Sequence, residues 1–180
     1  MSYTTIVPVL DTYHICPSTI KNEHYCGHMA CNTSSSIIGS SYDKSWMSIA
    51  GEKTKQRINI NLGTAYIIRN IKYVNYHDSG EDLNEGAQYF QLYGSNSNIM
   101  FDGYDRSDNL TSILAGRFER CTFETIPPFV FPNLPIYTPI PKEIAIDNTT
   151  PYQYYALKLG NNWEGNSGIG LRRIELQKED

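Results

Sequence analysis

The sequence predicts an all-β protein, built as a β-sandwich or barrel. Along its 180 residues, short runs rich in β-branched and aromatic residues alternate with clusters of Gly, Asn, Asp, Ser and Pro. This is the pattern of strands joined by turns. No stretch shows the i, i+3, i+4, i+7 apolar spacing of an amphipathic helix. The spacers are therefore not crossover helices, which excludes a parallel α/β sheet.

Five runs are the candidate strands. Residues 57–62 alternate strictly and place Ile58, Ile60 and Leu62 on one face. The other four runs are residues 66–76, 89–93, 152–159 and 170–176. Alternation with polar neighbours predicts that the following side chains face inward from two sheets: Ile58, Ile60, Leu62, Ile71, Phe90, Leu92, Leu157, Leu159, Ile174 and Leu176.

Two segments differ from the rest in composition. Residues 1–36 hold three of the four Cys and three of the four His, and residues 127–141 hold six of the nine Pro. Proline has no N–H to donate to a sheet, so the second segment is predicted to be an extended, polyproline-like connection across the surface. We therefore divide the chain into a Cys/His-rich N-terminal extension, residues 1–33, and a sandwich domain, residues 34–180, with a proline-rich insertion.

Charge and hydropathy exclude several classes of protein. With 15 Lys and Arg against 19 Asp and Glu, the formal net charge is −4, whereas a nucleic-acid binder normally carries a basic excess. No apolar run approaches the roughly 18 residues of a membrane span. The first ten residues have no basic flank and no long apolar stretch, so we expect a protein made without a signal peptide.

Several of these runs together resemble a known family. Trp46 followed by residues 56–63, and the closing pair 154–159 and 170–176, resemble the discoidin-like, or coagulation factor type C, family. The resemblance covers residues 34–177 and implies an antiparallel jelly-roll β-sandwich of the galactose-binding type. It also implies binding of glycans, lipids or proteins through loops at one end of the sandwich.

The middle of the chain fits the same layout. Residues 76–96 with Phe101 after them are similar to variants of the family in phage and microbial attachment proteins. The chain departs from the family at two places. No Cys follows Cys121, so the family's common disulfide between the two ends has no counterpart, and the proline-rich insertion has no match.

The resemblance further implies a calcium ion. Many members of the family hold calcium by the loop before the tryptophan and by a Glu in the last strand. Asp43, Ser45 and Glu175 occupy the similar positions here, and backbone carbonyls of a tight polar loop would complete the shell of hard oxygens. The alternative is a plain turn, with Glu175 paired to Arg172 or Arg173.

The N-terminal extension offers a different metal or redox site. Cys16, Cys26, His28 and Cys31, with His14 or His24 nearby, include thiolates and imidazoles of the kind that bind zinc. Their spacing fits no standard zinc finger, so zinc is less expected than calcium. A disulfide among them, or to Cys121, is one alternative. Ordinary buried thiols and surface imidazoles are the other.

Polar and aromatic residues in three loops suit sugar recognition. A glycan offers hydroxyl groups and apolar C–H patches, which planar polar side chains and aromatic rings complement. The alternative is that the Trp packs under its own turn and the amides form turns. The predicted ligand-binding residues are His77, Asp78, Tyr104, Arg106, Asn162 and Trp163.

No enzyme signature accompanies them. His77 is the only His outside the N-terminal cluster, and no Gly-x-Ser-x-Gly elbow occurs. A Cys–His pair with Cys121 has no flanking signature either. We therefore assign no catalytic residue.

These observations favour a non-catalytic module that recognises carbohydrate on a cell surface as part of a virus or phage particle. A recognition domain made without an export signal suits a particle assembled inside a cell and used outside it. Expected partners are a glycan or cell-surface receptor, and partner chains of the particle or of a homo-oligomer. A structural or scaffolding role is the alternative, with the sandwich and Phe129, Phe131 and Tyr137 of the proline-rich arm contacting other chains. A virion or extracellular-facing location is expected, with a cytoplasmic one as the alternative.

Overall fold

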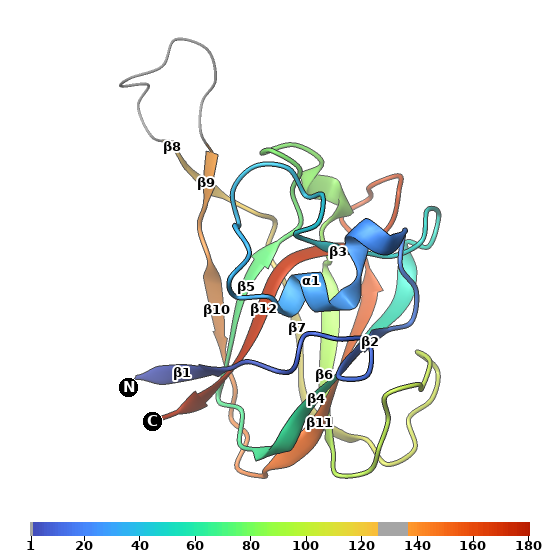
Figure 1. Cartoon of the computed structure of the whole chain (residues 1–180), viewed down its shortest axis with the longest axis vertical. Helices are drawn as coiled ribbons and strands as arrows, with labels where there is room; N and C mark the ends of the chain where they lie inside the picture. Colours follow the sequence, from blue (N-terminus) through green and yellow to red (C-terminus); the bar gives the residue numbers. More distant parts are fainter. Residues whose placement is uncertain (1, 126–136) are drawn as a thin grey trace.

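The computed structural model describes residues 2–125 and 137–180, and they form two five-stranded sheets packed on each other (Figure 1). Sheet A has the order β1 (Tyr3–Ile6), β12 (Gly170–Glu179), β5 (Asn70–Asn75) and β10 (Lys142–Ala145), and β3 (Trp46–Met47) also pairs β12. Sheet B has the order β2 (Ile15–Pro17), β4 (Thr54–Tyr66), β11 (Tyr152–Asn161), β6 (Tyr89–Ser95) and β7 (Thr111–Arg117). These strands pair antiparallel, which confirms the predicted all-β sandwich.

The core lies between the sheets and consists of the residues that the alternation selects. All ten predicted core side chains belong to one buried cluster, and the most exposed of them, Leu62, shows only 8% of its surface. In sheet B, Leu157 sits between Ile58 of β4 and Leu92 of β6 in register. A side chain of this kind contributes about 1.5–3 kcal/mol when it leaves water.

Five strands of the two sheets are not predicted from the sequence, and all five lie at sheet edges. They are β1, β3 and β10 in sheet A, and β2 and β7 in sheet B. An edge strand contacts a neighbour on one side only and is more exposed, so its alternation of apolar and polar residues is weaker. Strand β7, for example, has no fully buried residue.

The N-terminal 33 residues are built into the sandwich. Strands β1 and β2 each form an edge of one sheet, and Ala30 and Cys31 of α1 (Gly27–Cys31) join the core cluster. The short helix η1 (Glu23–Tyr25) precedes α1. The division at residue 33 therefore does not separate an appendage from a domain.

A two-stranded ribbon projects from one end of the sandwich (Figure 1). It pairs β8 (Phe123–Thr125) with β9 (Tyr137–Pro139). Pro139 therefore lies in an isolated ribbon and not in a central strand, as a residue without an N–H requires. Phe129 and Phe131 of the predicted proline-rich arm lie outside the described residues. Among the helices of residues 2–125 and 137–180, none has the length and apolar character needed to cross a bilayer.

Candidate functional site

The three loops with predicted ligand residues do not meet at one place. Residues 76–88, which include η2 (Leu83–Glu85), and residues 161–169 lie together at one end, where the N–H of Trp163 donates to Asn84 O (3.0 Å). Residues 96–110 leave the opposite end of β6 (Figure 1). The three loops therefore do not all lie at one end of the sandwich, where the family resemblance implies ligand binding.

His77 and Asp78 serve the fold. The His77 side chain is fully buried, and its Nε2–H donates to Ile37 O at 2.9 Å. Burial, and then the charge of Arg172, lower the pKa of His77 to about 4, so it is neutral at pH 7. Asp78 Oδ1 accepts from the Ser41 N–H at 3.0 Å. A buried neutral His cannot meet a glycan at the surface, which removes His77 from the predicted set.

Asn162 is also a structural residue. It is 4% exposed, and its amide donates to the carbonyls of Gly165 (3.3 Å) and Gly168 (2.8 Å) within its own loop. The same loop is held from the other side by Glu85, whose carboxylate accepts the N–H groups of residues 166–168. Glu85 was not predicted from the sequence, because a single carboxylate in a turn-rich stretch is part of no periodic pattern.

The loop of residues 96–110 folds back over the outer face of sheet B. Arg57 Nη1 donates to the carbonyls of Gly103 (2.9 Å) and Arg106 (2.8 Å), and Asn59 Nδ2 donates to the carbonyl of Asp102 (3.0 Å). These bonds from β4 place Tyr104 above the sheet. The Arg106 side chain points away to solvent and lies 3.5 Å from Asp102 and Asp108 carboxylates.

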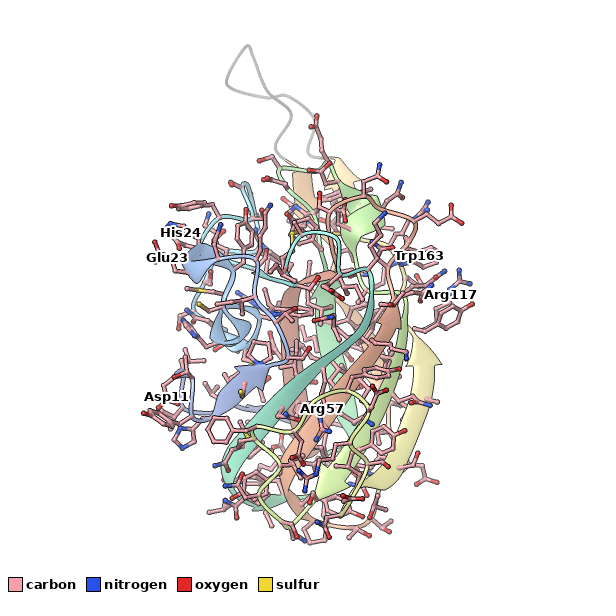
Figure 2. The ribbon with its side chains drawn as sticks, turned by 90° about the vertical axis from the view of Figure 1, so that its right-hand side faces the viewer. Asp11, Glu23, His24, Arg57, Arg117 and Trp163 are labelled. Atoms are coloured by element: carbon pink, nitrogen blue, oxygen red, sulfur yellow. The ribbon has the colours of Figure 1, made fainter. Side chains whose placement is uncertain are left out.

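A groove of about 530 Å³ opens between this loop and strand β7, and we call it the sheet-B groove. Tyr89, about half exposed, and Tyr104 belong to its lining. Figure 2 looks onto this face of the molecule. The lining residues are Tyr89, Phe90, Gln91, Tyr104, Ala115, Gly116, Arg117, Lys158 and Gly160.

Lys158 is the most enclosed charge in the groove. Only 6% of the residue is exposed, and its Nζ lies 5.4 Å from the ring centroids of both Tyr93 and Tyr104. It is the register partner of Arg57 on the neighbouring strand. Burial, and then the charge of Arg57, lower the pKa of Lys158, while Asp105 opposes the shift.

A second cation links the groove to the loop of Trp163. The Arg117 guanidinium lies 4.2 Å from the Trp163 ring and 5.6 Å from the Tyr89 ring. Arg120 lies 4.8 Å from the same Trp163 ring. Figure 2 shows Trp163 and Arg117 side by side at the edge of the sheet. Two of the six predicted ligand residues, Tyr104 and Trp163, thus lie in or next to one groove.

The comparisons with known proteins agree with this architecture. No protein-family model and no curated protein sequence matches the chain. Solved structures do match. The fold is that of the discoidin-type, galactose-binding-like modules. This confirms the family resemblance seen in the sequence at the level of fold.

Three of these structures illustrate the likeness. A chitosan-binding module from a Paenibacillus sp. IK-5 chitosanase/glucanase has a TM-score of 0.62 at 15% identity, covering 98% of this chain and 100% of the module. The family 32 module of Clostridium perfringens NanJ, in complex with galactose, has a TM-score of 0.61 at 12% identity over 98% and 100%. The lectin domain of lectinolysin, complexed with Lewis B antigen, has 0.61 at 10% over 98% of each chain.

The residues predicted from the discoidin-like resemblance to bind calcium do not come together. Asp43 Oδ1 lies 2.9 Å from His24 Nδ1, and Glu175 Oε2 accepts from Thr5 Oγ1 at 2.8 Å. Ser45 is fully buried, and its Oγ accepts from an arginine, Arg172. The three side chains therefore have separate partners.

Arg172 supplies a positive charge to the same loop. It is 1% exposed and donates to the carbonyls of Ser36 (3.1 Å), Ile38 (3.0 Å) and Ser40 (2.7 Å). Burial lowers the pKa of Arg172 to about 10, so it stays protonated at neutral pH. Carbonyl oxygens that would complete a calcium shell are already bound to a guanidinium. This donor set does not fit the ion.

In this structure Cys16, Cys26, Cys31 and Cys121 are free thiols, so the disulfide alternative stays a prediction. Burial raises the pKa of both Cys31 and Cys121 to about 12, which keeps them protonated. Within residues 2–125 and 137–180, no three His, Cys, Asp or Glu side chains gather as a metal-binding group. His28 and the cysteines therefore have no arrangement there that would support zinc.

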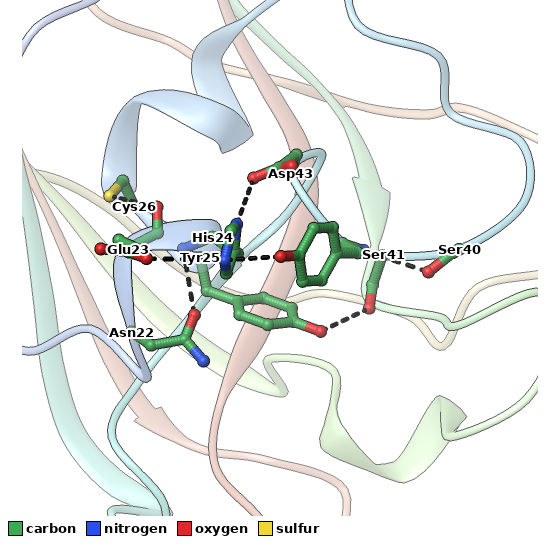
Figure 3. Close-up of polar contacts among 9 residues, drawn as sticks. Asn22, Glu23, His24, Tyr25, Cys26, Ser40, Ser41 and Asp43 are labelled. Atoms are coloured by element: carbon green, nitrogen blue, oxygen red, sulfur yellow. Dashed lines mark hydrogen bonds and ion pairs between the residues drawn. The ribbon is translucent and has the colours of Figure 1, made fainter.

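His24 is part of an exposed polar cluster (Figure 3). Its ring stacks on that of Tyr42 with centroids 4.0 Å apart, and its Nδ1 meets the Asp43 carboxylate. Cys26 Sγ donates to Glu23 O at 3.0 Å in the same cluster. The His24 ring nitrogens, the Tyr42 hydroxyl, the Asp43 carboxylate and the Cys26 thiol all have partners within the cluster, so these contacts account for them without a ligand.

Proposed function

We propose that this protein is a non-catalytic carbohydrate-binding module and that it binds saccharide in the sheet-B groove. The observation that carries the proposal is the lining of the groove. Tyr89 and Tyr104 offer rings for stacking on a sugar face, and Gln91 and Arg117 offer donors for hydroxyl groups. The similar solved structures support it, since they are a chitosan-binding module, a module in complex with galactose and a lectin domain complexed with Lewis B antigen.

The chemistry of the lining also favours binding without catalysis. Glycoside hydrolysis generally uses a pair of Asp or Glu side chains on either side of the scissile bond. The lining residues, taken from the part of the chain that the structure describes, include no carboxylate and no His, Cys or Ser. The groove therefore offers contacts for a sugar and no acid–base pair.

Attachment of a virus or phage particle to a cell-surface glycan is the setting that the sequence predicts, and it stays a prediction. A single shallow groove should bind a sugar weakly, on the order of millimolar. Several copies on one particle would multiply such weak contacts through avidity. A weak site of this kind would therefore be most useful on a particle that displays several copies of the protein.

The test is binding to a glycan array by the wild-type chain and a Tyr89→Ala/Tyr104→Ala variant. We expect the variant to lose at least about tenfold in affinity, because two stacking surfaces are removed. Tyr13→Ala is the matched control, since Tyr13 is 73% exposed and lies outside the lining. Equal binding by a folded double variant would contradict the groove as the site, and binding of no glycan by the wild type would contradict the function.

A further inference from the structure

The outer face of sheet B carries an arrangement of charge that costs stability. Arg57 and Lys158 are direct register partners on adjacent strands and share this face. Both are buried, at 0% and 6% exposure. Like charges placed opposite each other in a sheet destabilise it by up to about 1 kcal/mol. A local conflict of this kind is expected where function, and not folding, selects the residues.

The fold supplies hydrogen-bond acceptors to Nε and Nη1 of Arg57, although not to its Nη2, and it supplies none from the described residues to Lys158. The guanidinium of Arg57 donates to two backbone carbonyls and to Asn59 Oδ1. Lys158 has two tyrosine rings beside it, and no hydrogen-bond acceptor or ion-pair partner in residues 2–125 and 137–180. Its ammonium group lines the groove. The stem of Lys158 is thus packed against the sheet while its ammonium faces the groove, where it is free to donate to an acceptor on a ligand.

The nearest acids do not fill this role. Asp105 lies 3.9 Å from Lys55 Nζ, and Asp102 lies 3.5 Å from Arg106 Nε. The groove itself is lined by two cations, Lys158 and Arg117, and by no carboxylate among the described residues. Its lining charge is therefore positive, although the whole chain carries a formal charge of −4.

We propose that the sheet-B groove selects saccharides that carry an anionic substituent, a carboxylate or a sulfate, and that Lys158 receives that group. This inference rests on the proposed function. A charge-assisted hydrogen bond from the ammonium to an acidic oxygen satisfies the unpaired cation. The rings of Tyr89 and Tyr104 then hold the sugar, while Arg117 reaches a hydroxyl or a second acidic group.

The first test is an array of matched glycans, in which each sialylated, uronic or sulfated sugar has its uncharged core beside it. We expect at least about tenfold stronger binding to the charged members, weakened when salt is raised from about 0.05 to 0.5 M. Equal or stronger binding to the neutral cores would overturn this inference and leave the proposed function intact. Binding to neither set would overturn both. The carboxylated and sulfated arms show which anion is preferred.

The second test is titration of the best charged glycan into Lys158→Gln, Lys158→Arg and Lys178→Gln. Lys178 lies on β12 of sheet A and makes the matched control for loss of one charge. We expect Lys158→Gln to lose about tenfold in affinity for the charged glycan, with Lys158→Arg retaining most of it. An unchanged affinity of folded Lys158→Gln would contradict the role of Lys158. If that variant does not fold, Arg117→Gln on the exposed edge strand tests the same charge preference.

Discussion

Two buried cations of this molecule have opposite surroundings. Arg172, 1% exposed, donates to carbonyls of the loop before Trp46 and to Ser45 Oγ. Lys158, 6% exposed, lies over the faces of Tyr93 and Tyr104 and has no hydrogen-bond acceptor among residues 2–125 and 137–180. The first charge is compensated by the protein itself, whereas the second is left at the wall of an open groove.

This difference separates a structural charge from one that is available to a ligand. Removing Arg172 leaves several carbonyls of this loop without the donor that its buried guanidinium supplies, and the cost falls on folding. Removing Lys158 deletes a charge that the fold does not use, and the cost falls on binding.

The largest effect is expected for Arg172→Met. We expect the free energy of unfolding to fall by about 3–5 kcal/mol, because carbonyls of Ser36, Ile38 and Ser40 lose their donor. Urea unfolding followed by circular dichroism measures it. Arg106→Met is the control, since this exposed side chain makes only surface ion pairs and should cost no more than about 0.5 kcal/mol. Similar losses for the two variants would contradict the structural role of Arg172.

Leu157 and Lys158 are adjacent on β11, and their substitution should affect the stability of the fold very differently. Leu157→Ala should lower the free energy of unfolding by about 2–5 kcal/mol, because the side chain is fully buried in the core. Lys158→Gln should leave stability within about 1 kcal/mol, or raise it, because the repulsion from Arg57 is relieved. Chemical denaturation of both variants checks this. A loss at Lys158 as large as that at Leu157 would show that the fold does use this charge.

His77 predicts a dependence of stability on pH. Its pKa is lowered from 6.5 to about 4 in the folded protein. Between these two pH values the imidazole is protonated in the unfolded chain but neutral in the folded one. The corresponding stability is fully present above about pH 6.5 and is lost as the pH falls through 4. It amounts to at most about 3 kcal/mol.

The measurement is the unfolding free energy of the wild type and of His77→Gln between pH 7 and 4. Glutamine retains a donor for the Ile37 carbonyl but does not titrate. We expect a shallower pH dependence for the variant. Parallel curves for the two proteins would show that His77 is not the titrating group.

The smallest expected effect concerns calcium. Because Arg172 already binds the loop carbonyls, millimolar calcium should leave the melting temperature unchanged. A rise that a chelator reverses would instead support the original prediction of a site at Asp43, Ser45 and Glu175. Arg172→Met sharpens the test, since it frees the same carbonyls.

The fold was predictable where strands bury one face. The alternation around Ile58, Leu92 and Leu157 selects the core, because burial of one face requires a period of two. The edge strands β1, β2, β7 and β10 were not predicted, because their exposed sides weaken the alternation of apolar and polar residues. The integration of residues 1–33 depends on pairing with β4 and β12, far away in the sequence, which no local pattern reports.

The candidate site was predictable only in its loop residues. Tyr104 and Trp163 stand out as aromatics in polar loops, and both lie in or beside the groove. Tyr89, Arg117 and Lys158 were missed, because an outward-facing residue of a strand gives the same pattern whether it meets water or a ligand. The prediction that His77 binds a ligand was wrong for a different reason. No local sequence pattern shows that this residue is buried beneath a distant segment of the chain.

The most direct test of the account is chemical-shift mapping of the backbone amides as a glycan selected on the array is added. We expect the largest shifts at Gln91, Ala115 and Lys158 on sheet B, and in the loop of Tyr104. Shifts confined to residues 76–88 and 161–169, at the end of the sandwich, would contradict it and place the sugar on the loops.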